Sequence, residues 1–166
     1  MVNNENSVFG VENFALNHKA SKREIFNKNF FIGVISLSAL VLDQLLKLYV
    51  RSSFSVNETK GFLFTYVQNT GSLFGLFQGS VFPLIVLSFV ALFVLGFYYP
   101  NLEDNIFIWV MFALLAAGIV GNLIDRLWLG YVVDFINLKY WPVFNFADSC
   151  ICVSIVGLLW YSWKKK

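Results

Sequence analysis

Four long runs of apolar residues limit the fold of this chain more than any other feature of its sequence. The runs cover residues 30–50, 81–99, 106–129 and 146–163, and each approaches the roughly 20 residues that a helix needs to cross the hydrocarbon core of a bilayer. Only 13% of the 166 residues are charged, whereas soluble domains carry about a quarter. The sequence therefore predicts an α-helical membrane protein in which residues 30–166 form one domain with four transmembrane helices.

The distribution of lysine and arginine predicts how these helices are oriented. Residues 1–29 are polar and lack periodicity, so we expect a mobile tail, with a short interfacial helix near residues 19–29. Basic residues cluster in this tail and again in the last three positions, and the positive-inside tendency places such clusters in the cytoplasm. Both termini are therefore predicted to be cytoplasmic, and the links 51–80 and 130–145 to lie outside. A net charge of +2 is too small to indicate a nucleic-acid partner.

The two outer links contain segments that are typical of β-strands. "GFLFTYVQ" (61–68) and "YVVDFINL" (131–138) are rich in aromatic and β-branched residues and have the length of strands. "NTG" (69–71) is typical of a turn. We expect a small extracytoplasmic β-sheet on the helix bundle, and the link 51–80 is long enough to fold over a substrate as a loop lid.

The unusual polar residues all fall at the predicted outer face. Ionisable groups at membrane depth cost about 2.5–3.5 kcal/mol each on insertion scales and usually face the bundle interior. Gly118, Asn122 and Arg126 are four residues apart and form one stripe on a helix, and Gly118 would let another chain approach closely. Asp43 and Lys47 have the same spacing and are predicted to pair. The polar residues at this face are Asp43, Asn69, Asn122, Asp125, Arg126, Asp134, Asn145 and Asp148.

Asp134 and Asp148 form the candidate catalytic pair. Asp134 lies in a strand-like link, and Asp148 lies in the first turn of the last helix, with Asn145 as its N-cap. Two carboxylates held close together cannot both ionise easily, so the pair holds one proton near neutral pH. One group can activate water while the other protonates a leaving amine. The sequence thus predicts amide hydrolysis without a metal or a covalent intermediate, and leaves open which aspartate is the base.

Other catalytic schemes fit the sequence less well. His18 is the only histidine and lies in the N-terminal tail, which argues against Ser–His and Cys–His pairs and a two-histidine zinc site at the outer face. Cys150 and Cys152 point to nearly opposite sides of a helix, cannot bridge each other, and are expected to be buried apolar fillers. Asp125 and Arg126 are expected to pair with each other or with lipid headgroups.

Two classes of non-catalytic protein are also compatible with the sequence. Buried charges in a membrane helix also mark non-catalytic binding proteins and small transporters. A transport pathway should carry polar residues through both halves of the bundle, whereas the inner halves of these spans contain essentially none. A scaffold protein would tolerate the loss of both aspartates.

Five short blocks, in order between the predicted spans, resemble bacterial signal peptidase II, the lipoprotein signal peptidase. The resemblance implies an intramembrane aspartic endopeptidase, a hydrolase of the bacterial cytoplasmic (inner) membrane. Such an enzyme removes signal peptides from diacylglyceryl-modified prolipoproteins, cleaving just before the lipidated cysteine. The matching blocks are "DQLLK" (43–47), "NTGSLFG" (69–75), "GNLIDR" (121–126), "GYVVDF" (130–135) and "FNFADS" (144–149).

The resemblance also implies the roles of individual residues. Asp134 and Asp148 are the implied catalytic residues, with no metal and no cofactor. The implied partners are lipid-modified prolipoproteins and membrane lipids, with the cyclic peptide globomycin as an inhibitor, and a monomer is expected. Ser72 and Leu73 stand where the family often has two alanines, and Leu73 is expected to reshape the pocket. The implied substrate-binding or dyad-supporting residues are Asp43, Asn69, Gly71, Asn122, Arg126, Asn145 and Ala147.

Overall fold

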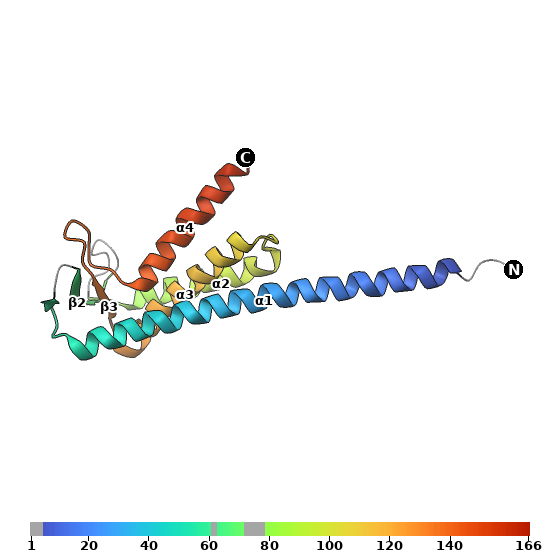
Figure 1. Ribbon diagram of the computed structural model, residues 1–166. Helices are drawn as coiled ribbons and strands as arrows, with labels where there is room; N and C mark the ends of the chain where they lie inside the picture. Colours follow the sequence, from blue (N-terminus) through green and yellow to red (C-terminus); the bar gives the residue numbers. More distant parts are fainter. Residues whose placement is uncertain (1–4, 61–62, 72–78) are drawn as a thin grey trace.

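The described part of the chain is built from long helices and a small antiparallel sheet at one end of them (Figure 1). A computed structural model describes the backbone of residues 5–60, 63–71 and 79–166, and side chains within those ranges from residue 25 onward. The helices are α1 (Glu5–Ser53), α2 (Phe82–Tyr98), the 3-10 helix η2 (Tyr99–Asn101), α3 (Ile106–Leu129) and α4 (Phe146–Lys164). The strands are β1 (Thr59–Lys60), β2 (Phe64–Asn69) and β3 (Val132–Ile136).

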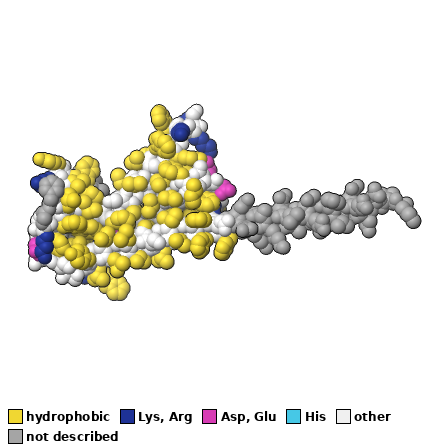
Figure 2. Space-filling model, viewed as in Figure 1, with side chains coloured by type: hydrophobic (Ala, Val, Ile, Leu, Met, Phe, Trp, Pro, Cys, Tyr) yellow, Lys and Arg dark blue, Asp and Glu magenta, His cyan; other side chains and the backbone are white. Residues whose placement is uncertain are grey.

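The predicted transmembrane helices are confirmed. Among the described residues, the segments 25–53, 82–101, 106–129 and 146–164 are helical, long and apolar enough to cross a membrane. Many of their large side chains face outward, which suits contact with lipid; Phe93, for example, is 74% exposed. Figure 2 shows apolar side chains covering the helical region, with charged side chains gathered toward its two ends. The chain is a multi-pass membrane protein.

Helix α1 differs from the prediction at its N-terminal end. The sequence predicts a mobile tail over residues 1–29, whereas α1 is one continuous helix from Glu5 to Ser53. In Figure 1 its first turns project well beyond the other helices. Residues 5–29 contain no proline, and an apolar helix that is already formed can be extended by one hydrogen bond per added residue without a new nucleus. A polar composition therefore does not end the helix.

Helix α3 lies at the centre and contacts the other three long helices. Small residues allow the closest approaches. A methyl group on Gly118 would lie 2.5 Å from the carbonyl oxygen of Ala147 on α4, and one on Gly121 would lie 2.6 Å from Asp43 Oδ2 on α1. These glycines therefore permit α1 and α4 to approach α3 where the polar residues gather.

The sheet confirms the predicted strands and adds a short one. Its order is β1-β2-β3, and both pairings are antiparallel. An apolar cluster that includes Val50, at the end of α1, holds the sheet against the helices; the other buried members are Tyr66, Val133 and Phe135. Part of the predicted lid, residues 61–62 and 72–78, lies outside the described part of the chain.

Candidate active site

The last strand and the last helix bring the two candidate aspartates together. Asp134 lies in the middle of β3. After the following loop the chain returns to β3, where Phe144 pairs with Ile136. The next residue, Asn145, caps α4, so that Asp148 in the first helical turn lies beside the strand. This return places two carboxylates that are 14 residues apart in the sequence in one site.

Two amide groups hold the carboxylate of Asp134, which is only 2% exposed. Asn69 Nδ2 donates to Asp134 Oδ2 at 2.7 Å, and Asn145 Nδ2 donates to Oδ1 at 2.7 Å. Asn69 reaches across the sheet because it pairs with Val132, two residues before Asp134, and such diagonal neighbours lie on the same face. Both oxygens of Asp134 therefore have a fixed, uncharged donor.

The carboxylate of Asp148 is held by the start of its own helix. Asn145 and Asp148 form a capping box: Asp148 N donates to Asn145 Oδ1 at 2.9 Å, and Asn145 N donates to Asp148 Oδ2 at 3.2 Å. The other carboxylate oxygen, Oδ1, accepts from Asn122 Nδ2 at 2.7 Å. The predicted N-cap role of Asn145 is confirmed, and the same side chain also contacts the other aspartate.

A buried ionic cluster lies behind these amides. Lys47 Nζ lies 2.8 Å from Asp43 Oδ2 and 3.0 Å from Asp125 Oδ2, and it donates to Asn122 Oδ1 at 3.0 Å. Asp43 Oδ1 in turn accepts from the backbone nitrogen of Ala147 at 2.9 Å. The cluster thus links α1 and α3 to the first turn of α4.

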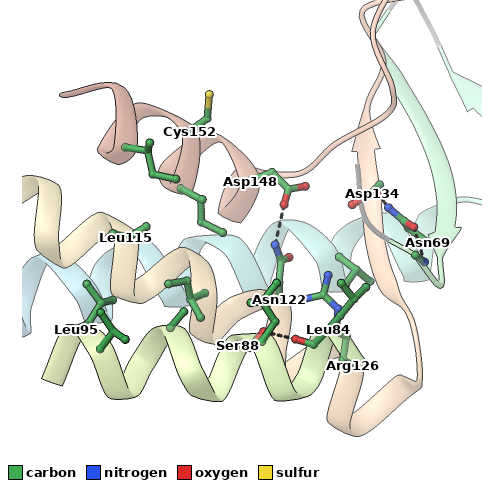
Figure 3. Close-up of a pocket in the computed structure, with 18 residues that line it drawn as sticks. Asn69, Leu84, Ser88, Leu95, Leu115, Asn122, Arg126, Asp134, Asp148 and Cys152 are labelled. Atoms are coloured by element: carbon green, nitrogen blue, oxygen red, sulfur yellow. Dashed lines mark hydrogen bonds between the residues drawn. The ribbon is translucent and has the colours of Figure 1, made fainter. Parts of the chain in front are cut away.

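A cavity of about 740 Å³ opens in front of the two aspartates. Figure 3 shows Asp134 and Asp148 at the same end of it, one from β3 and one from α4, with Arg126 at that end as well. The Nε of Arg126 is buried and has no hydrogen-bond partner among the described residues. The remaining walls are mostly apolar and come from α2, α3 and α4; they include Leu84, Leu87, Ala91, Val94, Leu115, Ile119, Ile151 and Ile155.

Burial and charge change the acidity of Asp134. Burial, and after it the negative charge of Asp148, raise its pKa to about 7. The hydrogen bonds from Asn69 and Asn145 and the positive charge of Lys47 oppose this rise. At neutral pH the carboxyl group of Asp134 is therefore poised between its two protonation states, which is what acid–base catalysis requires.

Comparison with known proteins assigns the chain to a family. The family model of signal peptidase (SPase) II matches residues 35–164. A lipoprotein signal peptidase of Halothermothrix orenii is 36% identical over 81% of this chain and 97% of its own length. One from Moorella thermoacetica is 39% identical over 76% and 89%. The chain belongs to the signal peptidase II family. A solved structure, described as a bacterial membrane enzyme, shares the fold with a TM-score of 0.74 and 27% identity, covering 81% of this chain and 94% of that one.

Membership of signal peptidase II decides between the classes left open by the sequence. Members of this family are peptidases, so the alternatives of a transporter, a binding protein and a scaffold are set aside. The structure also gathers the residues implied by the resemblance. Those that line the cavity are Asn69, Gly71, Asn122, Arg126, Asp134 and Asp148. Those in the contacts behind it are Asp43, Asn145 and Ala147.

Some predictions about neighbouring residues are wrong. Asp125 does not pair as expected with Arg126 or with lipid: its Oδ2 lies 3.0 Å from Lys47 Nζ and accepts from the backbone nitrogen of Val133 at 3.1 Å. Cys150 is buried as predicted, but Cys152 is exposed and lines the cavity, because residues two apart lie on nearly opposite sides of a helix. The two departures from the family pattern, residues 72 and 73, lie outside the described part.

The sequence also left Gln44 unassigned, and it did not predict that Gln44 contacts Asp125. Gln44 Nε2 donates to Asp43 Oδ2 at 3.1 Å and to Asp125 Oδ1 at 3.3 Å. Asp125 follows Asn122 by three positions and therefore shares its side of α3. The spacing therefore predicts that Asp125 faces the inside of the bundle, but it does not predict which residue Asp125 contacts.

Proposed function

We propose that Asp134 and Asp148 are the catalytic pair with which this member of signal peptidase II removes signal peptides from prolipoproteins. The observation that carries the proposal is that two carboxylates from separate elements meet at one end of a large apolar cavity. Each is held by neutral amide donors, and they interact strongly enough that Asp148 raises the pKa of Asp134. Such a pair suits a shared proton.

The shape and chemistry of the cavity support this substrate class. Its apolar walls run along α2, α3 and α4 and suit the apolar helix of a signal peptide, which would enter sideways from the bilayer. The diacylglyceryl chains of the substrate stay in lipid. The peptide bond before the lipidated cysteine then reaches the polar end, where Asp134 and Asp148 flank it.

In the proposed reaction a water molecule lies between the two carboxyl groups. The ionised aspartate accepts a proton from the water, and the oxygen of the water attacks the carbonyl carbon of the scissile bond. The protonated aspartate then gives its proton to the departing nitrogen as the carbon–nitrogen bond breaks. The products are a signal peptide with a new carboxyl end and a lipoprotein with a free amine on its cysteine.

The remaining polar residues divide between holding the pair and facing the substrate. Asn69, Asn122 and Asn145 already donate to the aspartates, so we assign them to orienting the carboxylates. Arg126 lines the cavity with a buried Nε that is free to donate. We assign Arg126 to binding a carbonyl or headgroup oxygen of the substrate, because a guanidinium is a fixed set of donors for oxygen.

The position of the site supports a location at the outer face of the bacterial cytoplasmic (inner) membrane. Lysines end the chain just after α4, which favours a cytoplasmic C-terminus. The aspartates and the sheet lie at the opposite end of the bundle (Figure 1). The cyclic peptide globomycin, the inhibitor that the family resemblance implies, is proposed to bind in the same cavity. We propose that the protein works as a monomer surrounded by membrane lipids.

The test uses the purified full-length protein and a diacylglyceryl-modified prolipoprotein, with the product masses as the readout. We expect cleavage just before the lipidated cysteine, inhibition by globomycin and no effect of a chelator. Asp134→Asn and Asp148→Asn should each lower the rate by about a thousandfold or more. Asp104→Asn, which makes the same change at an exposed aspartate between α2 and α3, is the control and should cleave normally. Near-normal turnover by either site variant would remove the catalytic pair.

A further inference from the structure

The ammonium group of Lys47 has a place in the site that the proposed chemistry does not use. Its Nζ lies within 3.0 Å of Asp43 Oδ2, Asp125 Oδ2 and Asn122 Oδ1. An ammonium group has three protons and no acceptor, so these oxygens use all of its hydrogen-bonding capacity. Lys47 is only 2% exposed, and a buried ion pair adds little net stability over an apolar replacement. Packing alone therefore does not account for it.

We propose that Lys47 is a positioning residue for the catalytic pair, which fixes the Asn122 amide and, through it and Asn145, the two aspartate side chains. The inference rests on the proposed function of Asp134 and Asp148. Lys47 and Asn145 lie behind the cavity wall, because both are almost fully buried and neither lines the cavity.

Two donors fix the orientation of the Asn122 amide. Its Oδ1 accepts from Lys47 Nζ at 3.0 Å and from Asn145 Nδ2 at 3.1 Å, which occupies both lone pairs of the oxygen. A rotated amide would place its NH₂ group against these two donors. The Nδ2 must therefore point the other way, toward Asp148 Oδ1, where it donates at 2.7 Å.

The hydrogen bonds also branch to the other aspartate. Asn145 Nδ2 has two protons; it gives one to Asn122 Oδ1 and the other to Asp134 Oδ1 at 2.7 Å. From Lys47, one chain of hydrogen bonds leads through Asn122 to Asp148, and a branch leads through Asn145 to Asp134. Loss of the lysine donor frees the Asn122 amide to rotate, which disturbs the hydrogen bonds to both Asp148 and Asp134.

Lys47 also acts on the pair through its charge. The positive charge of Lys47 lowers the pKa of Asp134 and so opposes the effects of burial and of Asp148. Without that charge, Asp134 stays protonated to higher pH. A residue that only packs the helices together would leave the pH dependence of the reaction unchanged. The charged groups that surround the pair are Asp43 and Lys47 on α1 and Asp125 and Arg126 on α3.

The experiment compares cleavage rates across pH for the full-length protein and its variants at position 47. Lys47→Met removes both the donor and the charge. We expect kcat to fall by about tenfold and the alkaline limb of the pH–rate profile, where activity falls as pH rises, to move to higher pH. Lys47→Gln keeps an amide donor, and should recover part of kcat with the limb still shifted. Asp125→Asn disturbs the same cluster without removing a positive charge, so its limb should not move to higher pH.

The outcomes separate this inference from the proposed function. The positioning role is overturned if both Lys47 variants keep the alkaline limb of the wild type and a kcat per folded molecule within about twofold of it. If Lys47→Met does not fold, Lys47→Met with Asp125→Asn removes one positive and one negative charge together; wild-type kcat in that double variant overturns the role as well. Activity of Asp134→Asn would instead remove the catalytic pair itself.

Discussion

At the scale of single residues, the site is notable for neutral donors next to acidic groups. Asn69, Asn122 and Asn145 donate to the two aspartates at 2.7 Å. An arginine or lysine in direct contact would favour the ionised form of both carboxylates. An amide fixes the position of the oxygen while favouring ionisation less, so one proton stays in the pair near neutral pH.

The replacement Asn69→Ala tests this role. The hydrogen bond from Asn69 lowers the pKa of Asp134, so its loss raises that pKa and moves the alkaline limb of the rate to higher pH. Loss of the donor should also lower kcat by about tenfold. Measured profiles of Gln68→Ala, an exposed neighbour on β2, should match the wild type. An alkaline limb of Asn69→Ala that moves to lower pH would contradict the assignment.

The sequence predicted the residue types of the site well and their contacts only in part. The four-residue spacing of Asp43 and Lys47 predicted their pair, which is confirmed at 2.8 Å. The contacts of Lys47 with Asp125 and Asn122 depend on how closely α1 approaches α3, and no local spacing encodes that distance. The direction of each asparagine amide likewise follows from the assembled network.

At the scale of elements, glycines on α3 decide how near α4 can lie. The backbone of Ala147 and the side chain of Ile151 face Gly118, and a methyl group there would lie 2.5 Å and 2.7 Å from their nearest atoms. Because Ala147 is followed by Asp148, any displacement of the start of α4 moves a catalytic carboxylate. The helix contact and the site are therefore coupled.

Gly118→Ala should accordingly destabilise the protein by about 1–3 kcal/mol through overpacking and lower the cleavage rate. Thermal unfolding in detergent measures the first effect. Gly96→Ala is a matched control on α2, because a methyl group there would meet no atom within 4 Å; its unfolding temperature should equal or exceed that of the wild type. Equal stability of the two variants would show that the helices tolerate a wider separation.

The elements themselves were largely predictable. Hydropathy located the spans, and β-branched and aromatic residues located β2 and β3. The prediction missed β1, which has two residues, and the extension of α1 back to Glu5. In both places the local composition does not favour the element. The neighbouring strand β2 supplies the pairing for β1, and the apolar part of α1 supplies the nucleus for its extension.

At the scale of the whole molecule, the fold collects the buried charged residues of its described part at one end. The aspartates, Lys47 and the sheet lie there, and lysines end the chain beyond the other end of α4 (Figure 1). This asymmetry lets a water-dependent reaction proceed at the membrane surface while the cavity walls contact an apolar substrate.

Cysteine labelling in intact cells tests the proposed orientation. In a Cys152→Ser background, Tyr140→Cys, in the loop before α4 where the side chain is 98% exposed, should react with a membrane-impermeant maleimide. Lys166→Cys should react only after the cytoplasmic membrane is opened. The reverse pattern would place the site on the cytoplasmic side.

The central claim is that Asp134 and Asp148 share one proton that the reaction uses. The pH dependence of kcat/KM of the wild-type protein tests it most directly, because this quantity reports the ionisation of the free enzyme. Since the pKa of Asp134 is raised to about 7, the account predicts that activity falls as pH rises through about 7, when the second carboxyl group ionises. A rate that stays constant or increases across that range would contradict it.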